Sequence, residues 1–452
     1  MEKLKLRRTK PSYYLPAFLL ILIVTNDGFT QQIFRSKSDS VKYRALTIKI
    51  VDNLESNPNS DNEELYRLAE SYVVKDIPAH AKGRYVLYDD LVRSNRRDTI
   101  KYIGLYNLRI RKIPEEVFDC VNLMELDISA CRIKKLPKAL NHLKQLETLA
   151  INKSKIKRLK VPLTENESLK NFDVAHNRIR WIPKGLNRFK SLEYLNVSGN
   201  KIRKLPSVLA DCERLVSINL SYNRVKNMDM KLMSNPNVKS LNLSHNRLPD
   251  LPFALSVFNN LEELNLSFNH IREISNNIPN KKLEFLSLYS NQLDHIPDRL
   301  FALSSLQTLD LSYNAIKTVP ADISKLSNLL SFSTSNNRLT QLPEEIGTLD
   351  KLQDLYLQNN QLAGLPRSLS NPHLIRLHVA FNQLHDFPSD LERLTALEEL
   401  YVGNNLIHKL PAEVLGLENL KALYFESNFI AIDGEVKDII ERMEHKHVQM
   451  KY

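Results

Sequence analysis

Residues 306–320 read LQTLDLSYNAIKTVP, and residues 192–206 read LEYLNVSGNKIRKLP. Counted from the first leucine, apolar residues stand at positions 1, 4, 6, 11 and 14, asparagine at position 9 and proline at position 15. The pattern returns in fifteen units, with twelve intervals of 23 residues and two of 22, and predicts a repeat protein. The units begin at Ile100, Leu123, Leu146, Leu169, Leu192, Leu215, Val238, Leu261, Leu283, Leu306, Leu329, Leu352, Leu374, Leu397 and Leu420.

The positions within one unit predict its local structure. Apolar positions 4 and 6 alternate with polar positions 3, 5 and 7, as in a short strand with one buried face. Asparagine at position 9 offers donors and an acceptor to backbone groups inside the coil. One unit cannot bury its leucines alone, so the units must stack, with strands about 4.8 Å apart. We therefore expect an α/β repeat solenoid with a parallel sheet on the concave face, short helical or irregular segments on the convex face, and helical caps at both ends.

At these residues the chain resembles the leucine-rich-repeat superfamily, whose consensus is L-x-x-L-x-L-x-x-N-x-L. The continuation LPRSL in Leu365–Leu369 is similar to the 23-residue class found in Ras-group and bacterial repeat proteins. The resemblance covers roughly residues 100–445 and implies a horseshoe fold. It names no ligand.

Residues 1–30 predict export. Basic residues such as Lys3 and Arg8 precede an apolar run from Tyr13 to Val24. That run suits a signal-peptide core and falls short of the ~20 residues that span a bilayer. Small residues near Thr30 suggest cleavage there, and an uncleaved membrane anchor is the alternative. We expect a secreted, cell-surface or periplasmic protein, or one anchored by this segment.

The repeat array has a different segment on either side. Residues 31–99 lack the pattern, and Ser60 with Glu63 forms a capping box for a helix; we expect a helical cap there, or alternatively a small separate module. Residues 100–432 hold the fifteen units. Residues 433–452 place apolar side chains at helical spacing, which predicts an amphipathic cap helix.

The sequence carries no catalytic signature. It has no phosphate-binding glycine loop, zinc-spaced cluster or nucleophile elbow. The three cysteines, Cys120, Cys131 and Cys212, fall at interior positions of the repeat and are expected to be buried thiols. We therefore predict a protein that is not an enzyme and has no cofactor or metal site.

Positions 3, 5, 7 and 8 have no core role, so they are the candidate binding positions. In the last four units position 5 becomes aromatic, and an arginine and a phenylalanine stand beside it. These candidates are Tyr356, Arg376, His378, Phe381, Tyr401 and Tyr424. Tyrosine and arginine are enriched at binding hot spots, so we predict that another protein binds this row. The alternative is a stacking ladder that stiffens the sheet. A shorter aromatic scatter at position 8 (Tyr222, Phe268 and Tyr313) extends the surface toward the middle.

Positions 10, 12 and 13 of the first six units are basic and lie on one flank. Between Ile100 and Asp229 there are 26 Lys and Arg against 13 Asp and Glu, a balance of +13, while the whole chain carries +11. The alternative function is therefore an envelope-associated binder of a glycan, lipopolysaccharide or acidic membrane surface. Nucleic acid is disfavoured as a ligand, because export would separate the protein from it. The simplest alternative is that these positions are solvated and tolerate basic residues without any binding role. The flank residues are Arg109, Arg111, Lys112, Arg132, Lys134, Lys135, Lys155, Lys157, Arg158, Arg178, Arg180, Lys201, Arg203, Lys204, Arg224 and Lys226.

Overall fold

The computed structural model describes residues 85–160, 166–205, 207–209, 211–228, 235, 237–250, 259–274 and 282–452. The chain divides into two compact units, Met1–Val86 and Leu87–Tyr452, and the second contains all fifteen repeats. The predicted signal peptide or anchor and the helix expected after Ser60 lie outside the described residues. Within the described part, no helix is both long and apolar enough to cross a bilayer.

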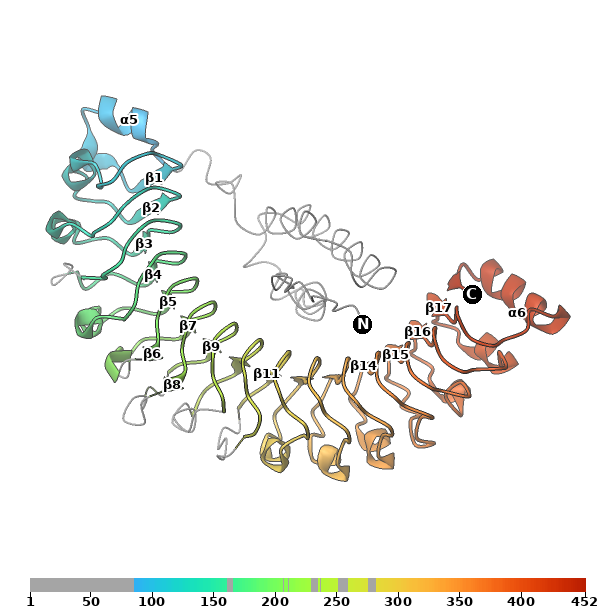
Figure 1. Ribbon diagram of the computed structural model, residues 1–452. Coiled ribbons are helices and arrows are strands. Elements are labelled where there is room, and N and C mark those ends of the chain that lie inside the picture. The colour runs from blue at the N-terminus through green and yellow to red at the C-terminus, as the bar shows by residue number, and fades with distance from the viewer. Residues whose placement is uncertain are drawn as a thin grey trace, which may run out of the picture. The chain divides into compact units, whose positions relative to one another are not determined.

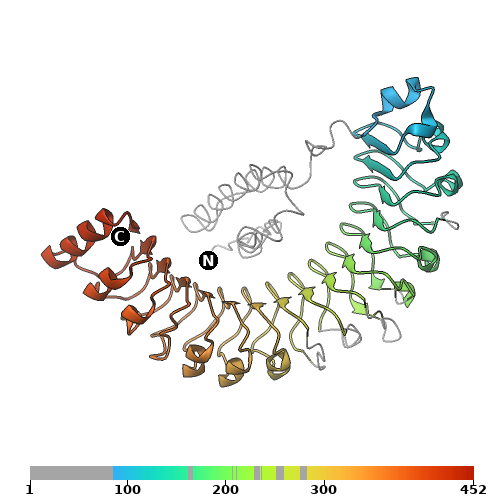
Figure 2. The ribbon, with the colours of Figure 1, turned by 180° about the vertical axis from the view of Figure 1, so that it is seen from behind.

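Leu87–Tyr452 form a curved stack of coils with a parallel, open sheet on the concave side, and Figures 1 and 2 show the strands along the inner side from both directions. This confirms the predicted fold. The sheet contains β1 (Tyr102–Tyr106), β2 (Glu125–Ser129), β3 (Thr148–Ala150), β4 (Asn171–Asp173), β5 (Tyr194–Asn196), β7 (Ser217–Asn219), β9 (Ser240–Asn242), β10 (Glu263–Asn265), β11 (Phe285–Ser287), β12 (Thr308–Asp310), β13 (Ser331–Ser333), β14 (Asp354–Tyr356), β15 (Arg376–His378), β16 (Glu399–Tyr401), β17 (Ala422–Tyr424) and β18 (Gln449–Lys451).

The register of this sheet follows the repeat. Tyr102 pairs with Glu125 across a 23-residue step, and Glu263 pairs with Phe285 across a 22-residue step. Each repeat position therefore lies beside the same position of the next coil. We number the coils 1 to 15 from Ile100. Positions 4 and 6 point inward and are fully buried, as with Leu309 and Leu311 of coil 10.

Among the described residues, most convex segments contain a short 3-10 helical turn. Most begin directly after the proline of position 15, whose ring presets its backbone angle. Each such turn buries an aliphatic residue, for example Ile323. The turns are η2 (Arg97–Thr99), η3 (Glu115–Asp119), η4 (Lys138–His142), η5 (Lys184–Arg188), η6 (Ser207–Leu209), η8 (Asp298–Ala302), η9 (Ala321–Lys325), η10 (Glu344–Thr348), η11 (Leu391–Arg393) and η12 (Ala412–Gly416), and the short pair β6 (Lys204–Leu205) and β8 (Asn227–Met228) lies on the same coils.

Asparagine at position 9 ties each coil to the one before it. In coil 5, the Nδ2 of Asn200 donates to the Val197 carbonyl at 2.9 Å and to the Val174 carbonyl of coil 4 at 3.0 Å. Its Oδ1 accepts the Ile179 backbone N–H of coil 4 at 2.9 Å. One side chain therefore satisfies buried backbone groups of two coils at once.

The first coils replace this asparagine. The Cys131 Sγ donates to the Leu105 carbonyl at 3.5 Å, and the Ser154 Oγ donates to the Cys131 carbonyl at 3.2 Å. Both supply part of the hydrogen bonding that asparagine provides elsewhere, and Leu108 of coil 1 has no side-chain donor. All three thiols are free and buried.

Both ends of the array carry a helix. Helix α5 (Tyr88–Arg93) packs against β1 with Leu91 fully buried. Helix α6 (Gly434–His445) begins at Asp433, whose carboxylate accepts the Val436 N–H, and buries the predicted apolar face. After it the chain adds β18 beside β17, a strand that the sequence pattern did not predict.

Position 8 has a left-handed backbone in every coil, with φ between 49° and 63°. Glycine or asparagine suits such a position, as at Gly199 and Asn336. Aromatic residues at this position, among them Tyr222 and Phe381, carry a backbone penalty of about 1 kcal/mol or more. Their presence therefore has another reason, either stacking or recognition.

Replacing the asparagine of a middle coil should destabilise the array. Asn223→Ala removes bonds to the Val197, Leu220 and Ser221 carbonyls and to the Ile202 N–H. Several buried backbone groups lose a partner, so we expect a loss of about 3 kcal/mol, read from chemical denaturation. The control is Asn219→Ala in the same coil, a half-buried residue whose Oδ1 accepts from the backbone N–H and hydroxyl of Ser221. Equal effects of the two substitutions would contradict the role given to position 9.

Candidate functional site

The four aromatic residues of position 5 in coils 12–15 form one row. Backbone pairing places Tyr356 beside His378, His378 beside Tyr401, and Tyr401 beside Tyr424. The rings of His378 and Tyr401 stack at 4.0 Å, and those of Tyr401 and Tyr424 at 4.4 Å, while Tyr356 meets His378 edge-on at 5.0 Å. We call these four residues the aromatic row. Its members alternate along each strand with buried leucines, so they belong to the concave side.

The aromatic row is unevenly exposed, which the sequence did not reveal. Tyr356 is 2% exposed and His378 is 8% exposed. Tyr401 and Tyr424 are half-buried, and Phe381 of position 8 is 38% exposed. Tyr356, one of the predicted contact residues, is therefore covered in the free chain and has almost no surface to offer a partner. The accessible part consists of Tyr401, Tyr424 and Phe381.

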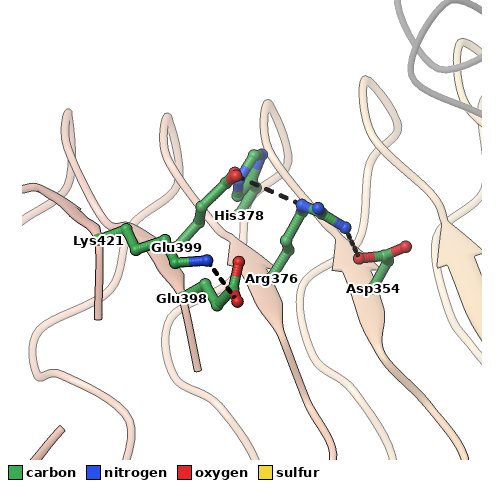
Figure 3. A network of polar contacts seen from close by, with 6 residues as sticks. All are labelled: Asp354, Arg376, His378, Glu398, Glu399 and Lys421. Atoms are coloured by element: carbon green, nitrogen blue, oxygen red, sulfur yellow. Dashed lines mark hydrogen bonds and ion pairs between the residues drawn. The ribbon is translucent and has the colours of Figure 1, made fainter. Parts of the chain in front are cut away.

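A network of ion pairs lies beside the aromatic row. The Arg376 guanidinium lies between two carboxylates of position 3, with Nη1 at 2.8 Å from Asp354 and Nε at 3.3 Å from Glu399 (Figure 3). Glu399 also accepts from the His378 Nε2 at 3.0 Å. Figure 3 shows Lys421 and Glu398, paired at 2.6 Å, beside this network. The network crosses three strands and holds Arg376 in one orientation.

The carboxylates of this network respond differently to their surroundings. Burial opposes ionisation of Glu399, but His378 and Arg376 outweigh it and hold its pKa below the ordinary value. Burial dominates at Asp354 and raises its pKa despite the contact with Arg376. Glu399 is thus the firmly charged partner. The sequence signal for the network was the order Asp354, Arg376, Glu399 at position 3 of successive coils.

The aromatic scatter of the middle coils is one continuous ladder. Tyr222 stacks on His245 at 3.9 Å, and His245 stacks on Phe268 at 4.0 Å. Tyr289 follows Phe268 at 5.1 Å, and Tyr313 follows Tyr289 at 4.9 Å. Burial lowers the pKa of His245 to about 4, so its ring is neutral at pH 7. We call these five residues the central ladder. Two of its members were not predicted from the sequence: His245, which shares position 8, and Tyr289, which joins from position 7.

A polar row occupies position 5 of the middle coils. In coils 5–8 an asparagine Oδ1 accepts the N–H of the serine two residues on, at 3.0–3.1 Å. The sequence Asn-x-Ser recurs in these coils, at residues 196–198, 219–221, 242–244 and 265–267, and this local bond gives it a structural role. In coil 10 the row holds Asp310, 1% exposed, which accepts from the Ser312 N–H at 3.0 Å. Burial raises the pKa of Asp310 to about 6.

The sixteen basic residues at positions 10, 12 and 13 of coils 1–6 lie on one flank, as the repeat register requires. We call them the basic flank. Fourteen are exposed, and Lys201 and Arg224 are half-exposed. The N–H of position 10 donates to the carbonyl of position 11 in the preceding coil, as from Arg132 to Ile110 and from Lys201 to Ile179. This ladder keeps equivalent cations of successive coils in line.

Comparisons with known proteins give the family. One family model, described as a leucine-rich repeat region, matches residues 98–273, and a second, described as a leucine rich repeat, matches residues 281–333. A comparison with curated proteins returns no match.

Solved structures share the fold. A leucine-rich-repeat protein of Leptospira interrogans is 26% identical, with a TM-score of 0.70, and the match covers 81% of this chain and 100% of that chain. The functional domain of InlJ from Listeria monocytogenes is 21% identical (TM-score 0.62; 77% and 72% covered). The ectodomain of the plant membrane receptor kinase GASSHO1/SCHENGEN3 from Arabidopsis thaliana, solved in complex with CASPARIAN STRIP INTEGRITY FACTOR 2, is 26% identical (TM-score 0.55; 79% and 46% covered).

Asp310 should make stability depend on pH. Its pKa is about 6 in the folded chain and about 3.9 in an unfolded one. A raised carboxyl pKa contributes stability below the unfolded value, and this contribution is lost as the pH rises through 6. Asp310→Asn should therefore stabilise the protein by about 2–3 kcal/mol at pH 7.5 and add nothing at pH 3.5.

The measurement is a pair of denaturation curves at the two pH values. The exposed Asp350, replaced by Asn, serves as the control and should show little change at either pH. An equal effect of Asp310→Asn at both pH values would mean that the carboxyl of Asp310 is not perturbed.

Proposed function

Because the chain belongs to the leucine-rich-repeat superfamily, we propose that it is a non-catalytic scaffold that binds another protein through the concave side of coils 12–15. The contact residues are Tyr401, Tyr424 and Phe381, with Arg376 beside them. Tyr356 and His378 are buried beside these residues, and the His378 ring stacks on Tyr401 and holds it in place.

One observation carries this proposal: aromatic side chains occupy four successive sites that the core does not need. Aliphatic residues at positions 4 and 6 already fill the interior, as Leu400 and Val402 do in coil 14. Small polar residues suffice at position 5 in the middle of the array, for example Asn219 and Ser287. Large rings with a polar tip are the side chains most enriched at the centres of protein interfaces.

The ion-pair network strengthens the site as a recognition surface. Arg376 is fixed by Asp354 and Glu399 and keeps its side chain about 22% exposed. Tyr401 is held between the rings of His378 and Tyr424. Side chains that are already ordered lose little entropy when a partner binds, so this corner is preorganised.

The comparisons support a protein partner. The Arabidopsis receptor ectodomain, 26% identical to this chain, was solved in complex with CASPARIAN STRIP INTEGRITY FACTOR 2. The fold leaves one long curved face for contacts, and no part of the solenoid core needs that face. The same comparison supports a place of action outside the cell, because the Arabidopsis protein is the ectodomain of a membrane receptor. The basic n-region and apolar run of residues 1–30 agree with export.

The proposal predicts which side chains touch the partner. A photo-crosslinking phenylalanine analogue at Phe381 should capture one protein from the native cell, which mass spectrometry then identifies. Tyr401→Ala and Tyr424→Ala should each weaken the Kd for that protein by about 30-fold or more, since a hot-spot side chain contributes at least about 2 kcal/mol.

Tyr194 provides the matched control, because it is a tyrosine of the concave side that is 49% exposed and lies in coil 5. Tyr194→Ala should leave the Kd within about twofold of wild type. The melting temperature of each variant shows whether a loss of binding reflects unfolding. An unchanged Kd in well-folded Tyr401→Ala and Tyr424→Ala variants would refute the assignment.

A further inference from the structure

The basic flank is a patch several residues wide rather than a single line of charges. Its cations occupy positions 10, 12 and 13 of coils 1–6, so the patch is about 10 Å across and about 24 Å along the stack. Backbone hydrogen bonds of 2.8–2.9 Å join position 10 of each of coils 2–6 to the coil before it. Lys204 pairs with Asn227, which shows that position 13 also stays in register. The cations therefore form ordered columns.

In the described part of the chain, the cations of the basic flank have no carboxylate partners within the protein. Among the described residues, none of the sixteen forms an ion pair. Lysines on other parts of the same array are paired, as Lys170 is with Glu147 and Lys239 with Glu262. Mutual repulsion among close, like charges is unfavourable, so a counter-charge from outside would stabilise the flank.

The single tryptophan of the chain lies within these columns. Trp181 occupies position 13 of coil 4, where coils 2, 3 and 5 have Lys135, Arg158 and Lys204. It is 49% exposed. Burial of a tryptophan in the core would yield a large hydrophobic gain, and this one is left outside among cations. Tryptophan, like tyrosine, is enriched at the boundary between lipid headgroups and hydrocarbon.

We propose that the basic flank docks on an acidic lipid membrane surface, with Trp181 at the level of the headgroups. A planar anionic surface matches a patch with several columns of cations and a central exposed indole. Each Lys or Arg near such a surface adds to the attraction, and the aromatic ring adds a contribution that salt does not screen. The concave side is left open, so coils 12–15 and the flank can act at the same time.

Trp181 is an intrinsic fluorescent probe of contact between the basic flank and a membrane. Because Trp181 is the only tryptophan, its fluorescence reports the flank and no other segment, including the apolar run of residues 13–24. Vesicles containing phosphatidylglycerol should shift the emission of the full chain to shorter wavelength, and vesicles of phosphatidylcholine alone should not. Brominated lipids in the acidic vesicles should quench it.

Matched charge variants isolate the flank. Replacing Lys135, Arg158 and Lys204 by Glu should weaken binding to the acidic vesicles by about 100-fold or more. Replacing Lys138, Lys184 and Lys190 by Glu changes the net charge equally at exposed sites outside the flank, and should weaken binding by less than about fivefold. Trp181→Ala should leave binding that disappears at high salt, whereas Tyr194→Ala, equally exposed in the native chain, should behave as wild type.

Three results would overturn the proposal. The first is an emission spectrum that acidic vesicles leave unchanged. The second is equal loss of vesicle binding in the two charge variants. The third is retention on heparin through the flank without any binding to acidic vesicles, which would assign the surface to a sulfated polymer. None of these outcomes bears on the partner of coils 12–15, so the two proposals fail or stand separately.

Discussion

The hydrogen bonds of the position-9 asparagine constrain the whole array. Each buried Nδ2 donates to carbonyls of its own coil and of the coil before it, and each Oδ1 accepts an N–H from that earlier coil, as Asn200 does with Val197, Val174 and Ile179. Buried backbone groups must find partners, so neighbouring coils can stack only in the register that this side chain accepts. Cys131 and Ser154 keep part of that pattern where the array begins. A fixed register then places every repeat position beside its equivalents, and a choice of residue at one position becomes a row on the surface.

Three rows show how this rule builds distinct surfaces. Aromatic residues at position 5 stack into the aromatic row, and lysines and arginines at positions 10, 12 and 13 line up as the basic flank. Rings at position 8, joined by Tyr289 from position 7, form the central ladder although the left-handed backbone at position 8, for example at Phe268 with φ of 55°, disfavours them. The framework tolerates such rows because leucines elsewhere hold the coils together. Different surfaces can thus coexist on one solenoid without competing for the core.

The features that follow from the 23-residue repeat could be predicted from the sequence. The strands, the convex turns, the buried thiols and the alignment of Tyr356, His378, Tyr401 and Tyr424 all follow from counting positions. The sequence did not predict what depends on side-chain direction across coils. The fixed position of Arg376 arises from its ion pairs with Asp354 and Glu399 in the coils on either side, and Tyr356 is buried with its ring edge-on to His378 of the next coil. Strand β18 also escaped prediction, because Gln449–Lys451 is short, follows a helix and lacks the repeat pattern. The repeat pattern does not identify the binding partner, since surface residues vary independently of the framework.

The central claim is that coils 12–15 present a preformed aromatic contact surface whose inner members are already covered. Hydroxyl-radical footprinting of the chain, alone and with its captured partner, measures this directly because aromatic side chains report their own exposure. We predict that Phe381 and Tyr401 react in the free chain and are protected in the complex, and that Tyr356 reacts in neither. Unaltered reactivity of Phe381 and Tyr401 in a saturated complex would contradict it.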